Sequence, residues 1–200
     1  MHAKIRDTTM KKTPLVSVDW QHQQSVTAKQ FRCGFCDESV ASERGYYTNA
    51  GEQVYIRICP LCKRPSFWEY GSQFPGVAFG SPVKSLPSDV ETLYNEAREC
   101  CSSNAYTGAV LLLRKLLMNI AVGLGAPAGE PFMKYVEYLA NKGYVPPNGK
   151  GWVDHIRKKG NEANHEITLM NKTDAEELIV FSEMLLKFIY EFPQRVPQTP

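Results

Sequence analysis

"CGFC" at residues 33–36 and "CPLC" at residues 59–62 frame the stretch that decides the first half of the fold, with 22 residues between the two pairs. A gap of two residues lets both thiolates of a pair reach one tetrahedral ion, with sulfur about 2.3 Å from zinc. The sequence therefore predicts one structural Zn²⁺ per chain. Redox-active pairs or disulfides are the alternative. The predicted ligands are Cys33, Cys36, Cys59 and Cys62.

Segments with strand character flank both pairs: "KQFRC" precedes the first pair, "QVYIRIC" precedes the second and "PSFWEY" follows it. A short antiparallel sheet joined to two metal knuckles is a zinc ribbon. Such a ribbon can staple a segment too small to hold its own core, contact a protein or contact nucleic acid. Nucleic-acid contact would use the ribbon's basic and aromatic side chains. These are Phe31, Arg32, Phe35, Tyr46, Tyr47, Tyr55, Arg57, Lys63 and Arg64.

After Pro87 the apolar periodicity becomes helical and continues to about residue 192. Five helices are predicted, over 87–101, 105–125, 131–143, 149–165 and 174–192. Three capping signals place helix starts: Ser88 with Glu91, then Asn104, then Thr173 with Glu176. The second helix is apolar nearly all round, which predicts a buried centre or a dimer face. The predicted fold class is thus α+β, a small zinc ribbon with four cysteine ligands followed by an all-α five-helix bundle.

The predicted organisation is an N-terminal arm (1–25), the ribbon (26–72), a linker (73–87), the helical domain (88–192) and a tail (193–200). The longest apolar stretch, 109–124, is interrupted by polar residues, and the N-terminus lacks the apolar segment of a signal peptide. We therefore expect a cytoplasmic protein without a membrane partner. A net charge of +2 gives no large positive field, so nucleic-acid contact would be local. No small-molecule substrate is indicated, and we expect a homodimer through the helical half.

"IRKKGNEANHE" at residues 156–166 places Arg157, Asn161 and His165 at four-residue steps along one helix face. Histidine can act as a general base and arginine can stabilise a phosphorane, which suits RNA cleavage. The same residue types suit a hydrogen-bonded brace that ties this helix to the bundle. Gly160 within the stretch predicts close approach of another backbone, because glycine costs about 1 kcal/mol in a helix.

Arg114 interrupts the apolar second helix. A buried guanidinium requires an acidic or hydrogen-bonding partner, and Glu96 and Glu99 on the first helix are the local candidates. A phosphate-facing role is the alternative. Cys100 and Cys101 have no metal-ligand company in the sequence and are interpreted as core residues.

The order of these parts resembles the bacterial family called domain of unknown function 4145, over about residues 28–192. The matching segments are the ribbon cysteines, "LPSDVETLYNEAREC", "AYTGAVLLLRKLL", "IRKKGNEANHE" and "TDAEELIVFSEMLLKFIYE". That family resembles the HEPN superfamily of helical domains found in bacterial toxin, restriction and phage-defence systems. The resemblance implies a HEPN-like bundle.

HEPN ribonucleases carry a more closely spaced arginine and histidine on one helix, which form a composite site across a homodimer. Here seven residues separate Arg157 from His165. The spacing favours a non-catalytic module that binds protein or nucleic acid in a bacterial defence or mobile-element context. The alternative is a metal-independent endoribonuclease that uses Arg157 and His165. The predicted binding residues are Arg114, Arg157 and His165, and Arg157, Asn161 and His165 are the catalytic candidates.

Overall fold

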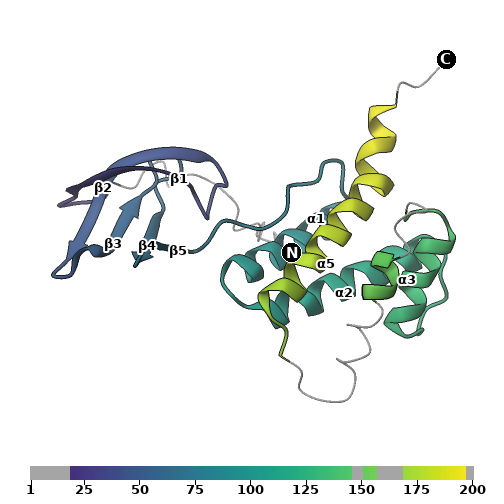
Figure 1. Ribbon diagram of the computed structural model, residues 1–200. Helices are drawn as coiled ribbons and strands as arrows, with labels where there is room; N and C mark the ends of the chain where they lie inside the picture. Colours follow the sequence, from purple (N-terminus) through teal and green to yellow (C-terminus); the bar gives the residue numbers. More distant parts are fainter. Residues whose placement is uncertain (1–18, 146–150, 157–168, 197–200) are drawn as a thin grey trace, which may run out of the picture. The chain divides into compact units, whose positions relative to one another are not determined.

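The computed structural model describes residues 19–145, 151–156 and 169–196. The chain divides into two compact units, residues 1–78 and residues 79–200 (Figure 1). The boundary falls inside the predicted linker, 73–87. The first unit is an antiparallel sheet and the second is helical, so the predicted α+β class is confirmed. Arg157, Asn161 and His165 lie outside the described residues, as do most of the predicted arm and half of the predicted tail.

The first unit is a five-stranded meander in which each strand pairs antiparallel with the next (Figure 1). Its strands are β1 (Gln24–Arg32), β2 (Ser39–Thr48), β3 (Gly51–Ile58), β4 (Pro65–Glu69) and β5 (Ser72–Phe74). Tyr70 and Gly71 both have positive φ, 45° and 84°, as a two-residue hairpin turn between β4 and β5 requires. The cysteine pairs occupy the β1–β2 and β3–β4 loops, so the hairpins bring both knuckles to one end of the sheet.

The two faces of this sheet differ. On one face Phe31, Tyr55 and Trp68 are buried, with Tyr55 stacked on Trp68 at 6.0 Å between ring centroids. On the other face a row of directly opposed residues crosses four strands, from Tyr46 to Ile56 to Phe67 to Phe74. Phe67 is 41% exposed and Phe74 is 50% exposed. We call these four residues the apolar row.

The second unit is built around α2. Its helices are α1 (Ser88–Ser102), α2 (Tyr106–Gly123), α3 (Phe132–Asn141), a helical segment at 151–156, and α5 (Lys172–Leu186). α2 packs against α1, α3 and α5, which confirms its predicted place at the centre of the helices. Its length and composition would also allow it to cross a bilayer, a property that buried core helices share.

All three predicted helix caps are wrong, although α1 and α2 begin within one residue of their predicted starts and α5 begins two residues before its own. α1 follows Pro87 without a side-chain cap, so Ser88 and Glu91 form no capping box. α5 has a full box two residues before the predicted one, made by Asn171 and Asp174 in place of Thr173 and Glu176. At α2 the N-cap is Ala105, and Asn104 accepts a hydrogen bond from the Tyr106 hydroxyl. Pro87 is itself the N-cap residue, and its carbonyl accepts the first helical hydrogen bond, from Glu91 N–H at 2.8 Å.

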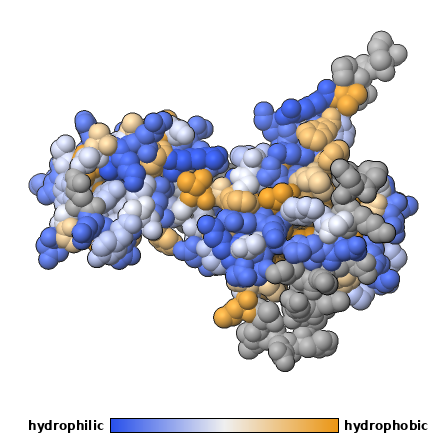
Figure 2. Space-filling view, viewed as in Figure 1, coloured by the Kyte–Doolittle hydropathy of each residue, from blue (hydrophilic) through white to orange (hydrophobic). Residues whose placement is uncertain are grey.

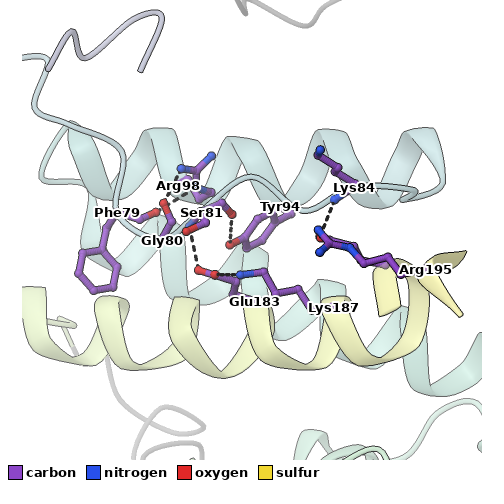
Figure 3. Close-up of polar contacts among 10 residues, drawn as sticks. Phe79, Gly80, Ser81, Lys84, Tyr94, Arg98, Glu183, Lys187 and Arg195 are labelled. Atoms are coloured by element: carbon purple, nitrogen blue, oxygen red, sulfur yellow. Dashed lines mark hydrogen bonds and ion pairs between the residues drawn. The ribbon is translucent and has the colours of Figure 1, made fainter. Parts of the chain in front are cut away.

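Residues 79–84, which we call the strap, lie between α1 and α5 and are held by their main-chain groups (Figure 3). From α1, the buried Arg98 donates to the carbonyls of Phe79 (2.9 Å) and Gly80 (2.6 Å), and the Tyr94 hydroxyl donates to the Ser81 carbonyl at 3.1 Å. The helices thus bind the strap through its peptide groups.

From the other side, two glutamates accept the strap's N–H groups. Glu183 on α5 accepts from Ser81 N–H at 2.8 Å and also pairs with Lys187. Glu191 accepts from Lys84 N–H at 3.0 Å and pairs with Arg195. Both glutamates are therefore bound as charged acceptors, which make stronger hydrogen bonds than neutral groups do.

The last helix continues past α5 as a π-helical turn, η2 (Lys187–Glu191), and a 3-10 turn, η3 (Phe192–Arg195). This end extends beyond α3 in Figure 1, and Figure 2 shows apolar surface along it. Phe188 and Phe192 are about two-fifths exposed and contact each other edge to face at 5.3 Å.

Candidate metal centre

The two cysteine loops have the same backbone geometry. In the first, Cys33 N–H donates to the Glu38 carbonyl at 2.9 Å, and Asp37 N–H donates to the Cys33 carbonyl at 2.9 Å. In the second, Cys59 N–H donates to the Arg64 carbonyl at 3.0 Å, and Lys63 N–H donates to the Cys59 carbonyl at 3.0 Å. The closing residues, Asp37 and Lys63, have φ of 62° and 60°. The loops are therefore matching knuckles that present their sulfurs toward each other.

The four predicted ligands come together. Their Sγ atoms all lie within 4.8 Å of one another, with Cys33 to Cys62 at 3.7 Å and Cys36 to Cys59 at 3.9 Å. Sulfurs at tetrahedral corners about 2.3 Å from an ion are about 3.8 Å apart. Three of the four cysteines are buried, and all six cysteines of the chain are free thiols. The cluster can hold a metal ion.

The protonation of these thiols depends on whether an ion is bound. Burial raises the pKa of the Cys36 thiol to about 11 and also raises the pKa of Cys62. Burial opposes ionisation of Cys59 too, but the backbone N–H groups of Cys62 and Leu61 stabilise its thiolate and bring its pKa below the ordinary value. Without an ion the cluster therefore retains protons at neutral pH, and metal binding must release them.

The first knuckle also depends on a glycine. A Cβ at Gly34 would collide with the carbonyl oxygens of Pro75 and Gly76, which follow β5. The Gln73 side-chain amide reinforces this contact, because it donates at 3.2 Å both to the Arg32 carbonyl and to the Pro75 carbonyl. The sequence shows a glycine between two ligands, but it does not show that the backbone about forty residues later packs against that glycine.

Most basic and aromatic side chains proposed for a nucleic-acid strand are used inside the ribbon. Arg57 is 2% exposed and donates to the carbonyls of Ser42 and Thr27, with its guanidinium over Tyr55 at 5.2 Å. Arg64 lies over the Phe35 ring at 5.3 Å, and Arg32 pairs with Asp37 at 3.1 Å. Phe31 and Tyr55 belong to the same buried cluster as the cysteines.

Arg114 lies on α2 with its guanidinium over the Phe132 ring at 4.7 Å. Burial lowers its pKa from the usual arginine value. It lines a cavity together with Glu96, one of its two predicted partners, whereas Glu99 is not part of that lining. Cys100 and Cys101 contact the helical core, and the cysteine cluster of the ribbon is the one group of potential metal ligands found within the described residues.

The described part of the fourth predicted helix, residues 151–156, packs against α5 through apolar side chains. Ile156 is buried, and Trp152 stacks on Phe181 of α5 with 6.1 Å between ring centroids. His155 on the same segment contacts Glu177 at 2.7 Å. The apolar side of this helix therefore faces α5, while Arg157, Asn161 and His165 lie beyond the described residues.

A family model described as domain of unknown function (DUF4145) matches residues 95–199, just over half of the chain. The match starts within α1 and takes in α2, α3 and α5, whereas the ribbon lies outside it. No curated protein and no solved structure matches the chain. The extent of the family match shows that this chain belongs to the DUF4145 family.

Proposed function

We propose that this chain is a non-catalytic interaction module, in which a zinc-stapled ribbon and a HEPN-like helical unit bind a protein partner. The observation that carries the proposal is the closed sulfur cluster: Cys33, Cys36, Cys59 and Cys62 supply four ligands at tetrahedral spacing. Four thiolates fill the coordination shell of zinc and leave no position for a substrate or an activated water. The ion's role is then to stabilise the ribbon.

Zinc is the ion that this donor set fits best. Tetrahedral sulfur sites select zinc or iron, and a mononuclear structural site of two knuckles is the common zinc arrangement. The ribbon also needs such a staple, because its described core is small: Phe31, Tyr55 and Trp68 with the cysteines make up its buried cluster. A segment this small gains much of its folding free energy from the metal.

A protein partner accounts for the ribbon surface better than nucleic acid does. The apolar row leaves Phe67 and Phe74 exposed on one face. Arg57, which would have contacted a strand, is buried and bonded to β1 and β2, and Arg64 covers Phe35. Exposed aromatic side chains are typical of protein interfaces, whereas nucleic-acid surfaces need exposed Lys and Arg, and Arg57 and Arg64 are taken up inside the ribbon. A bacterial defence or mobile-element setting, implied by the family resemblance, belongs to the same proposal.

The first test is an RNA digest with the purified full-length chain, without added divalent cations, alongside a measurement of metal per chain. The proposal expects one zinc and no cleavage. It also expects His165→Ala to lower stability by roughly 1–3 kcal/mol, because a brace loses its hydrogen bonds. Cleavage that leaves a 2′,3′-cyclic phosphate and disappears in a stable His165→Ala protein would establish the endoribonuclease that uses Arg157 and His165.

A second test separates protein from nucleic-acid binding. Fluorescence anisotropy with a single-stranded RNA probe should show no binding tighter than the non-specific range, roughly 10⁻⁴–10⁻⁶ M at physiological salt. Tighter binding that is lost in Lys63→Ala, on the exposed second knuckle, would replace the protein partner with RNA.

A further inference from the structure

A groove runs between α1 and α2 on the helical unit. It is a cavity of about 990 Å³, bounded at one end by residues 128–135. Apolar side chains from both helices line it: Leu93, Leu111, Met118 and Val122. Leu111 is 58% exposed and Val122 is 40% exposed. A central helix that packs against three neighbours thus still leaves a row of apolar side chains to cover.

The α2 residues in this groove follow the spacing of a helix-packing stripe. Leu111, Lys115, Met118 and Val122 are separated by four, three and four residues, which keeps them in one line along the helix. The other positions of α2 that face α1, α3 and α5 are buried. The stripe is therefore a fourth packing face of α2, with one lysine among apolar residues.

The charges of the groove have opposite signs on its two sides. Asp89 and Glu96 of α1 supply the acidic side, while Arg114 and Lys115 of α2 supply the basic side. In a two-fold dimer the same surface meets itself, so a residue on one side of the groove contacts a residue on the other side of its copy. Because the groove has one acidic and one basic side, a two-fold dimer brings opposite charges together at two places, once for each copy.

We infer that a second copy of this chain docks in the α1–α2 groove about a two-fold axis. The two α2 stripes lie antiparallel, and Lys115 of each copy faces the acidic side of the other. This deepens the proposed function, and rests on it, because it names one protein partner of the interaction module. A second copy is favoured over a foreign helix because one surface already carries both complementary charges.

The expected affinity follows from the size of the groove. The stripe from Leu111 to Val122 is about 17 Å long, and two helices side by side are about 20 Å wide. That face is smaller than the roughly 800 Å² per partner that stable complexes bury. The dimer is therefore expected to dissociate in the micromolar range.

Sedimentation of the full-length chain tests this inference over about 1–100 µM, a range that brackets a micromolar Kd. The wild type should be mostly dimer at the top of that range, and Leu111→Asp should be monomer throughout. Lys115→Glu and Glu96→Lys should each raise the dissociation constant by roughly tenfold or more, and the double reversal should restore most of the loss. Glu99→Lys, the same charge change one turn along α1 and outside the groove, should leave the constant unchanged.

A wild-type monomer at every concentration would overturn the inference, as would a dimer that Leu111→Asp leaves intact. If Leu111→Asp fails to fold, the charge reversals at exposed Lys115 and Glu96 still decide the question. The RNA digest keeps the two proposals apart. A wild-type monomer that cleaves no RNA would contradict the groove dimer and leave the proposed interaction module standing. A dimer that cleaves RNA would support the groove dimer and contradict the proposed non-catalytic module.

Discussion

A methyl group at position 80 has no room in the strap. Gly80 has φ of 72°, and a Cβ there would lie 2.6 Å from Cγ2 of Ile179 on α5. Gly80→Ala should therefore destabilise the helical unit by about 1–3 kcal/mol, measured by denaturant unfolding. Gly108→Ala is the control: its Cβ would meet Cys100 Sγ at an ordinary 3.7 Å, and alanine gains about 1 kcal/mol in a helix. Equal effects at the two positions would contradict the strap packing.

Removing one sulfur should have a different result in the ribbon than in the bundle. Cys33→Ser takes away a ligand from a closed site, so we expect loss of the metal and of the near-ultraviolet signal from Trp68, with the helical signal retained. Cys100→Ser, in the helical unit, should keep a full complement of metal. Metal retained in Cys33→Ser would show that this cysteine is not a ligand.

The residues of the cysteine cluster were predictable because a knuckle is local: two cysteines three positions apart reach one ion whatever surrounds them. Arg57 was not predictable in that way. Its sequence neighbours, a strand with aromatic residues, are typical of an exposed nucleic-acid surface. Its burial instead depends on the Ser42 and Thr27 carbonyls, 15 and 30 residues away.

Among the elements, the strap has an attachment that depends on pH. Burial raises the pKa of Glu183, but the Lys187 ammonium and the Ser81 N–H lower it more, so its pKa lies below the ordinary value of 4.5. A depressed carboxylate pKa adds stability that is fully present above the unfolded value and is lost as pH falls through the folded value. The melting temperature of the helical unit should accordingly decline below about pH 4.5.

Glu183→Gln should flatten that decline, because glutamine carries no charge to titrate. It should also lower the melting temperature at neutral pH, where the wild-type carboxylate is bound to Lys187 and Ser81. Glu99→Gln, at an exposed position on α1, should keep the wild-type profile. A profile unchanged by Glu183→Gln would show that the strap does not depend on this carboxylate.

The positions of the helices could be predicted from the sequence, but their caps and the hydrogen bonds that hold the strap could not. Apolar periodicity runs through each helix and survives small errors at its ends, so α2 and α3 lie within the predicted ranges. Caps depend on the geometry by which the chain enters, which is why Asn171 with Asp174 displaced the predicted box. The strap was interpreted as a linker because its bonds to Arg98 and Glu191 join residues 18 to 107 positions apart.

At the scale of the whole molecule, the two units should respond separately to loss of the metal. Chelation in a buffer without denaturant should unfold the unit at residues 1–78 and leave that at 79–200 folded. The tryptophans report on this division: Trp20 and Trp68 lie in the first unit, and Trp152 packs on Phe181 in the second. Thermal unfolding should show two transitions, of which one moves when zinc is restored. A single transition that moves as a whole would show that the units unfold together.

The hydrogen bonds that hold the strap also determine which of its positions can vary among related proteins. Since Arg98, Glu183 and Glu191 bind peptide groups, the side chains at positions 82 and 84 make none of the hydrogen bonds described for the strap, whereas the Ser81 side chain adds a hydrogen bond to Glu183. Natural variation can accumulate at positions 82 and 84, short of a proline at 84, where an N–H is needed. Gly80 and the three charged side chains that bind the strap, Arg98, Glu183 and Glu191, must instead be inherited as a set. Related proteins could thus differ at several positions of the strap and still keep the same backbone path into α1.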